Sequence, residues 1–300
     1  MEVINKEINS TKELFRTLNI KDDVLSIEQK KFISDKGYLI IPPTDFIKKN
    51  LKRLNELTTN LIIKEGSRGG WEGKEKHYKE GKPFEVNCDR LGNLIEKNII
   101  FGELILIPEI LMIAYEIIKG DIKVGGLNFR NPHKNFGEQA IHIDGMPRES
   151  TRDSFSGVVC YIYLDDATIE NGATRIIPNT HKKIGWPDNY INTNERQKNE
   201  IRAIAEAGSI VAFNLNTWHA GAKNINGKPR KTIFMQIKKR DQEQLLNYKK
   251  YLSKETKKKL NECQKYLLSI RDIDPTQKED SVSVGNFYKK QFGKDRGAIK

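Results

Sequence analysis

Two patterns of apolar and polar residues divide the chain near residue 121. Before that point, apolar residues recur at the spacing of amphipathic helices, and one short apolar stretch ends at Pro42-Pro43, where the missing N–H groups stop strand pairing. The pattern predicts helices over residues 26–32, 45–64 and 104–118 and a strand over 37–41. The first 120 residues are therefore expected to be mainly helical.

Beyond residue 121 the sequence favours short β-strands. Stretches rich in β-branched and aromatic residues alternate with Gly, Pro and Asn clusters, as is typical of strands joined by turns. The predicted strands cover residues 124–129, 140–143, 158–164, 173–177, 210–213 and 232–237. Helical spacing returns over 242–251 and 254–270, and a polar C-terminus follows that we expect to be partly disordered. This order predicts a mainly β fold with flanking helices, an α+β class, built on a double sheet or barrel.

The segment from Glu65 to Arg90 matches neither pattern. Five glycines in it interleave with the aromatic side chains of Trp71, His77, Tyr78 and Phe84. Long loops of this composition are often functional covers of binding sites. The sequence therefore predicts a mobile lid in this segment.

The chain has 300 residues, with 52 Lys plus Arg against 40 Asp plus Glu and a formal net charge of +12. Hydrophobic residues make up 37% and charged residues 31%, a balance typical of globular proteins rather than of disordered or membrane-embedded ones. The excess positive charge would suit nucleic acid, an anionic membrane surface or an acidic substrate. Because much of it lies in Lys-rich runs among Leu, Tyr and Glu, we expect solvated surface charge and no nucleic-acid partner.

Neither a disulfide framework nor a membrane span is indicated. Cys88, Cys160 and Cys263 are widely spaced and form no CxxC pair, so a thiolate zinc motif is not indicated either. No apolar run reaches the roughly 18 residues of a membrane span. Residues 1–15 lack the apolar core of a signal peptide. We therefore expect a cytoplasmic protein with reduced thiols and no membrane partner.

His142 and Asp144 form the chemically most suggestive pair. In a strand, the side-chain period of two points both to the same face, where an imidazole and a carboxylate can bind one metal ion. His219, shortly after the apolar strand over 210–213, is the best candidate for a third ligand. Two imidazoles and one carboxylate are the donor set of non-haem Fe(II) oxygenases. The spacing alone also allows a structural role for each histidine.

Three features of the surrounding sequence agree with a binding site. Arg230 follows His219 by eleven residues, just before the strand over 232–237, where its guanidinium could form a bidentate pair with a carboxylate. Residues 158–166 read Val-Val-Cys-Tyr-Ile-Tyr-Leu-Asp-Asp, a buried strand that ends in two carboxylates. Residues 170–182 read Glu-Asn-Gly-Ala-Thr-Arg-Ile-Ile-Pro-Asn-Thr-His-Lys, a turn, a strand and a second turn.

In this order the motifs resemble the phytanoyl-CoA dioxygenase-like family of Fe(II)- and 2-oxoglutarate-dependent oxygenases, from Gly37 to about Gln236. The resemblance implies a double-stranded β-helix, a jelly-roll or cupin-like core over about 121–240. The N-terminal helices of 1–120 would pack on one sheet, and 241–300 would form a helical and polar extension of a single domain, 1–300. One departure is Pro178-Asn179, where the family usually has Pro-Gly; Asn tolerates the left-handed conformation of such a turn.

The resemblance also implies roles for individual residues. His142, Asp144 and His219 would bind Fe(II), and Arg230 would pair with the distal carboxylate of the cosubstrate 2-oxoglutarate. The cosubstrate pocket would further be lined by Gln139, Tyr161, Thr174 and Asn128. Gln139 lies at an odd offset from His142, so this role requires a bulge or the end of regular structure over 137–139.

A dioxygenase of this kind would consume O2 and 2-oxoglutarate, release succinate and CO2, and by default hydroxylate a C–H bond of a small-molecule substrate. The intact Asp144 argues against halogenation, for which related enzymes replace the carboxylate. The same site could instead catalyse desaturation, epimerisation or ring closure, and a different class is a non-catalytic basic nucleic-acid-binding protein. Arg130, Arg148 and Arg152 could recognise an anionic group of the substrate, with surface placement as the alternative for each.

Several further residues are expected to serve the fold. We expect His181 to serve its turn or the surface, and His77 and His133 to be solvated. Cys160 alternates with Tyr161 and is expected in the core. Asp165 and Asp166 are adequately explained as a junction between strand and turn.

Overall fold

The computed structural model describes residues 7–271 of the chain. Its strands are, in chain order, β1 (Tyr38–Ile41), β2 (Cys88–Leu91), β3 (Ile122–Pro132), β4 (Gly157–Tyr163), β5 (Arg175–Ile177), β6 (Ile201–Arg202), β7 (Ile210–Asn214), β8 (Trp218–Ala220) and β9 (Thr232–Lys239). Its α-helices are α1 (Thr11–Thr17), α2 (Ile27–Lys36), α3 (Asp45–Glu65), α4 (Leu94–Lys97), α5 (Ile100–Leu104), α6 (Pro108–Ile118), α7 (Tyr248–Tyr251), α8 (Lys254–Lys259) and α9 (Glu262–Leu267).

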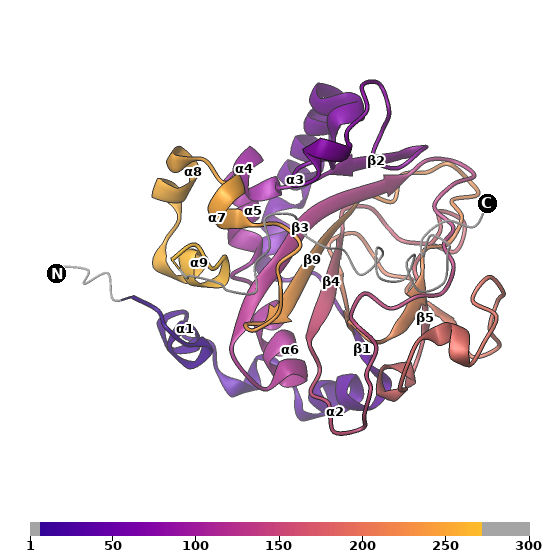
Figure 1. The fold of residues 1–300 in the computed structure, drawn as a ribbon, viewed down its shortest axis with the longest axis horizontal. Helices are drawn as coiled ribbons and strands as arrows, with labels where there is room; N and C mark the ends of the chain where they lie inside the picture. Colours follow the sequence, from indigo (N-terminus) through magenta and orange to yellow (C-terminus); the bar gives the residue numbers. More distant parts are fainter. Residues whose placement is uncertain (1–6, 272–300) are drawn as a thin grey trace.

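The strands form two antiparallel sheets. The larger sheet has six strands in the order β1-β7-β4-β9-β3-β2, and the smaller has three in the order β6-β5-β8. Figure 1 shows the helices that precede β3 and those that follow β9 gathered around one side of the large sheet, with β5 of the small sheet on the other side. The predicted class, mainly β with flanking helices, is confirmed.

Alternate residues of the large sheet enter two different hydrophobic cores, as the two-residue period of a strand requires. On β4, Val158, Cys160 and Ile162 join the core that the helices cover. The neighbouring Val159 and Tyr163 join a second core. That second core also takes Ile176 of β5, so it lies between the two sheets. Functional side chains on this inner face are therefore shielded from solvent by both sheets.

The helices on the outer face share one core with residues from both ends of the described chain. Helix α6 contributes seven buried residues, and buried side chains of α3 and α9 belong to the same cluster. The sheet contributes the outward-facing positions of β3, β4, β7 and β9. None of the helices in residues 7–271 combines the length and the hydrophobicity that a membrane crossing requires.

Most predicted elements are present, with differences of a few residues at their ends. The helices expected over 26–32 and 45–64 are α2 and α3, and the strand expected over 37–41 is β1. Of the later strands, β3, β4, β5, β7 and β9 match their predictions, and β3 is longer than expected. The strands β2, β6 and β8 were not predicted. Strand β2 has two consecutive polar residues, Asp89 and Arg90, instead of an apolar stretch, and β6 and β8 have only two and three residues, too few to show a period.

The helix predicted over 104–118 begins four residues later, at Pro108. Proline at the first helical position lacks an N–H and disfavours helical geometry in the residue before it, and Ile107 is accordingly extended with ψ of 119°. Residues 100–104 form the separate helix α5. The strand predicted over 140–143 is also wrong: within it, only His142 makes a bridge.

The predicted C-terminal helices are shorter than expected. Residues 242–247 are not helical, because Gln244 and Leu245 bond to the backbone of β3 at its bulge: Gln244 Nε2 donates to Val124 O and Leu245 N to Gly125 O, both at 2.7 Å. The helix predicted over 254–270 is divided into α8 and α9 at Asn261, whose side chain caps α9. The polar tail predicted to be disordered lies, beyond residue 271, outside the described residues.

The glycine-rich segment between α3 and β2 contains only two short 3-10 turns, Gly66–Arg68 and Glu75–His77. Its aromatic residues pack on one another, with the ring centroid of Trp71 lying 5.7 Å from that of Tyr78 and 5.2 Å from that of Phe84. The expected long loop is therefore present. Its function as a lid stays a prediction.

Candidate metal centre

His142 and His219 are brought together by the backbone. His219 lies in β8, and His142 pairs with it in a single antiparallel bridge. Asp144 is held next to them because its N–H donates to Leu215 O at 2.8 Å. Residues 77 positions apart thus meet at one end of the inner core, where the ring of Phe213 lies 4.5 Å from that of His219.

The three side chains form a compact donor set. One ligand atom from each of His142, Asp144 and His219 lies within 4.8 Å of the others. The carboxylate oxygens of Asp144 lie 3.8 Å from His142 Nε2 and 3.6 Å from His219 Nε2. The two histidines are only 5% and 2% exposed, whereas Asp144 is partly open to solvent. Such a set, reachable from one side, fits a divalent metal ion that keeps positions free for other ligands.

Backbone carbonyls select the tautomer of both histidines. The Nδ1 atom of His142 lies 2.8 Å from Ala140 O, and that of His219 lies 3.0 Å from Thr217 O. A carbonyl oxygen can only accept, so each Nδ1 carries the proton and donates it. Each Nε2 is then left with a lone pair on the side of Asp144, which is the form that binds a metal ion.

Arg230 supplies an isolated positive charge inside the protein. It is 3% exposed, and its Nε donates to Asn171 O at 3.3 Å. Within residues 7–271, its NH2 atom has no hydrogen-bond partner and no carboxylate lies within 4.0 Å of its guanidinium. Burial lowers the pKa of Arg230 from its ordinary value. Because an unpaired buried charge is costly, this guanidinium is suited to bind an anionic ligand such as a carboxylate.

Tyr161 and Thr174, both predicted to line the pocket, lie near this charge. Burial and the negative charge of Asp144 raise the pKa of Tyr161 above its ordinary value. The positive charges of Arg130 and Arg230 offset only part of this rise. Thr174 Oγ1 accepts a hydrogen bond from Tyr163 at 3.2 Å. Tyr163, whose hydroxyl also acts on the pKa of Arg230, was missed in the sequence although the period of two from Tyr161 points to it.

Gln139 and Asn128 occupy the expected region. Gln139 Oε1 accepts from Gly221 N at 2.9 Å, two residues after His219. Residues 137–139 have no regular structure, and Gly137 has a φ of +95°, so the end of regular structure that Gln139 requires is present. Asn128 pairs with Phe234 of β9 and, by the alternation of β3, faces the inner side. The binding roles of both residues stay predictions.

The three arginines considered for anion recognition differ in their surroundings. Arg130 is already paired with a carboxylate, since its Nε donates to Glu85 at 3.0 Å and its NH2 also contacts Glu85. Arg148 is buried but donates to the backbone carbonyls of its own loop, among them Thr151 O at 2.7 Å. Arg152 is exposed. The structure thus gives Arg148 and Arg152 structural or surface positions and leaves Arg130 beside the inner face.

The remaining histidines differ in their burial. His181 is not at the surface: it is 1% exposed, its Nε2 hydrogen-bonds with Ser34 O at 3.1 Å, and burial lowers its pKa to about 4. His77 and His133 are exposed, as expected.

Asn179 adopts the predicted left-handed conformation with a φ of 67°. Cys160 is buried in the outer core, also as predicted.

Known proteins are similar to this chain in fold and in parts of the sequence. A family model described as phytanoyl-CoA dioxygenase matches residues 33–232. An uncharacterised protein of Mycobacterium tuberculosis is 31% identical over 86 residues, which cover 28% of this chain and 30% of that protein. The iron/alpha-ketoglutarate-dependent dioxygenase penM of Penicillium thymicola is 39% identical over 66 residues, covering 22% of this chain and 19% of penM. The matches therefore span less than a third of these curated relatives.

The crystal structure of EctD from S. alaskensis with bound Fe is similar over most of its length. It has a TM-score of 0.59 at 15% identity and covers 73% of this chain and 79% of the EctD chain. At this identity the likeness concerns the fold, and it confirms the predicted jelly-roll core with flanking helices.

Proposed function

The chain belongs to the phytanoyl-CoA dioxygenase family, and we propose that it is an Fe(II)- and 2-oxoglutarate-dependent oxygenase that acts on a small molecule. The observation that carries this proposal is the meeting of His142, Asp144 and His219 in one donor set at the inner face that also holds the buried, unpaired Arg230. The first three residues suit Fe(II), and Arg230 suits the distal carboxylate of 2-oxoglutarate.

The chain's own groups would prepare this site in three ways. The carbonyls of Ala140 and Thr217 keep both imidazoles in the tautomer whose Nε2 can bind a metal ion, before any ion arrives. Arg230 gives the dicarboxylate a fixed orientation, and Gln139, Tyr161, Thr174 and Asn128 would line its pocket. The apolar inner core, including Phe213 and Val159, limits the access of water to the reacting groups.

When bound, iron and 2-oxoglutarate supply the oxidising chemistry, in which O2 is consumed and succinate and CO2 are released. Hydroxylation of a C–H bond is the default outcome for the substrate. Desaturation, epimerisation or ring closure would use the same residues and differ only in the product. We also propose that the chain is a single domain, because residues from α1 to α9 share one outer core with the large sheet.

The test uses the purified protein without oxygen. Fe(II) followed by 2-oxoglutarate should produce a weak visible charge-transfer band, and admission of O2 with candidate metabolites should stimulate succinate release. Mass spectrometry of the product then distinguishes hydroxylation from the other outcomes. A nucleic-acid-binding protein would instead show no band and a steeply salt-dependent affinity for DNA or RNA, which would overturn the proposal.

A further inference from the structure

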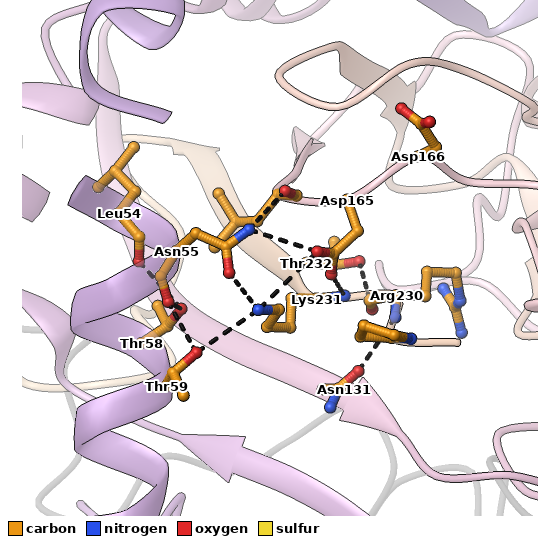
Figure 2. Close-up of polar contacts among 12 residues, drawn as sticks. Leu54, Asn55, Thr58, Thr59, Asn131, Asp165, Asp166, Arg230, Lys231 and Thr232 are labelled. Carbon is orange, nitrogen blue, oxygen red and sulfur yellow. Dashed lines mark hydrogen bonds and ion pairs between the residues drawn. The ribbon is translucent and has the colours of Figure 1, made fainter. Parts of the chain in front are cut away.

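We propose that Asp165 is a positioning residue for Arg230: it fixes the backbone from which the guanidinium extends toward 2-oxoglutarate. The inference rests on the proposed function, since it concerns the affinity for that cosubstrate. Asp165 and Asp166 are adjacent carboxylates at the end of β4, yet only Asp165 contacts the segment that carries Arg230. Figure 2 shows Asp165 within the network around Lys231, and Asp166 apart from it.

Arg230 lies where the sheet gives its backbone little support. The register of β9 with β3 and with β4 begins at Thr232, two residues later. Residues 225–229 before it are exposed. One backbone bond, from Leu164 N to Lys231 O at 2.8 Å, reaches this segment from β4. The remaining restraint on residues 229–231 must come from side chains.

The neighbouring Thr232 hydroxyl donates to Arg230 O at 3.3 Å, and three side chains from other parts of the fold bond to consecutive residues of the segment. They are Asn171, whose Nδ2 donates to Pro229 O at 3.2 Å, Asn131, whose Oδ1 accepts from Arg230 N at 3.1 Å, and Asp165, whose Oδ2 accepts from Lys231 N at 2.8 Å. Asp165 is the only one of the three with a full charge, and a hydrogen bond to an ionised acceptor is the stronger kind.

Asp165 also connects this segment to helix α3. Its Oδ1 lies 3.8 Å from Lys231 Nζ and accepts from Asn55 Nδ2 at 3.3 Å. The side chain of Asn55 in turn contacts Lys231 Nζ and donates to Leu164 O at 2.8 Å. Figure 2 shows these contacts between helix α3 and the segment that carries Lys231. Helix α3, Asp165 and Lys231 therefore form one polar unit.

The side chains just before β9 continue the alternation of that strand, which explains how this unit acts on Arg230. Ile233 of β9 enters the outer core and Lys231 contacts α3, whereas Arg230, one residue before Lys231, is buried. If this alternation extends to residue 230, a Lys231 held on the α3 side directs Arg230 to the inner side. A binding group that is displaced by on the order of 1 Å can lose much of its contribution to the free energy of binding. Removing the Asp165 carboxylate should therefore weaken binding of the distal carboxylate without removing any group that touches it.

Asp166 provides a matched control. Its Oδ1 accepts from Ala207 N at 2.8 Å, its side chain is exposed, and within residues 7–271 this carboxylate forms no hydrogen bond or ion pair with residues 229–231. Asp165→Ala and Asp166→Ala thus delete the same group one residue apart. Asp165→Asn is the conservative variant, because the amide oxygen can still accept from Lys231 N.

The experiment measures ligand binding rather than turnover. Each variant is loaded with Mn(II) and titrated calorimetrically with 2-oxoglutarate, and then with 2-oxopentanoate, which has the same chain length but no distal carboxylate. Asp165→Ala should raise the Kd for 2-oxoglutarate about tenfold and leave the Kd for 2-oxopentanoate unchanged. Asp165→Asn should restore part of the affinity, and Asp166→Ala should bind both ligands as the unmodified protein does.

The inference would be overturned if Asp165→Ala raised the Kd for both ligands equally, or raised neither. Adding Asp165→Ala to Arg230→Met should have no further effect on 2-oxoglutarate binding, and an additive loss would also count against it. If Asp165→Ala does not fold, Asp165→Asn alone must still show a selective loss. Failure of the unmodified, Mn(II)-loaded protein to bind 2-oxoglutarate would overturn the proposed function itself, and with it this inference.

Discussion

His142 and His219 face each other across one antiparallel bridge, in which each backbone N–H donates to the other's carbonyl, at 2.9 Å and 3.0 Å. Their ring centroids lie 4.3 Å apart. The same backbone also orients the rings through the carbonyls of Ala140 and Thr217. The two imidazoles are thus held in place by main-chain bonds that do not depend on a bound ion.

The first prediction follows from that arrangement. His219→Ala and Asp144→Ala should each lower the affinity for Fe(II) or Mn(II) by at least about 100-fold. The reason is that removing a direct metal ligand lowers the metal affinity more than removing a residue that only hydrogen-bonds to a ligand. Metal content after dialysis and equilibrium titration measure the loss. His133→Ala, which removes an exposed histidine, should retain full metal binding. Unchanged affinity in either ligand variant would contradict the metal assignment.

The second prediction concerns the shape of the cation at position 230. Arg230→Lys keeps the positive charge but loses the planar pair of N–H donors. The Kd for 2-oxoglutarate should therefore rise tenfold or more, which corresponds to about the binding free energy of one charge-assisted hydrogen bond. Metal binding should not change. Titration of 2-oxoglutarate into the Mn(II)-loaded variant measures the effect, and an affinity equal to that of the unmodified protein would exclude a bidentate contact.

The sequence is sufficient for the parts of the site that depend on short-range patterns. His142 and Asp144 are two residues apart, and His219 follows an apolar strand, so their convergence needs only the correct fold. The expected strand at His142 is nevertheless reduced to one bridge. Asp144 reaches the site through its bond to Leu215 rather than through strand alternation, a contact that no local pattern encodes.

Contacts made by loops could not be predicted in this way. Glu85 lies 45 residues before Arg130, in a segment without periodicity, and nothing in the spacing indicates that the two meet. The polar unit around Asp165 likewise depends on how α3 packs against the sheet. Tyr163 differs from these, because its position follows from the period of β4 and was available in the sequence.

The third prediction tests how closely neighbouring atoms pack against the backbone of Gly221. A Cβ at this position would lie 2.4 Å from Gly137 O and 2.8 Å from Gln139 Oε1. Because a backbone carbonyl cannot turn away as a side chain can, Gly221→Ala should reduce the free energy of unfolding by about 1–3 kcal/mol. Denaturant unfolding measures the loss. Gly120→Ala, whose Cβ would meet nothing closer than 3.9 Å, should have a much smaller effect.

The fourth prediction is a dependence of stability on pH through His181. A histidine in the unfolded chain takes up its proton near pH 6.5, whereas His181 in the folded protein does so only near pH 4, because burial disfavours its charged form. Between these values the unfolded state binds more protons, so stability falls as the pH falls, by at most about 1.4 kcal/mol per pH unit.

Replacement of His181 by Gln should flatten this slope between pH 6.5 and 4.5, whatever its effect on absolute stability. His133→Gln is the comparison, since this histidine is exposed. Urea unfolding at several pH values gives the slopes. The assignment would be wrong if His181→Gln and the unmodified protein lost stability in parallel over this range.

The fifth prediction concerns the contact between the glycine-rich segment and the inner face. The Arg130 guanidinium holds the pKa of Glu85 well below its usual range, at about 2. Since loss of one partner leaves the other charge buried and unpaired, Glu85→Gln should reduce the free energy of unfolding by about 2 kcal/mol, less than for a fully buried pair because Glu85 remains partly open to water. Glu80→Gln, an exposed change in the same segment, should cost almost nothing. Replacing Arg130 by Met in the Glu85→Gln protein should restore part of the stability, and a further loss there would show that the two residues do not act as a pair.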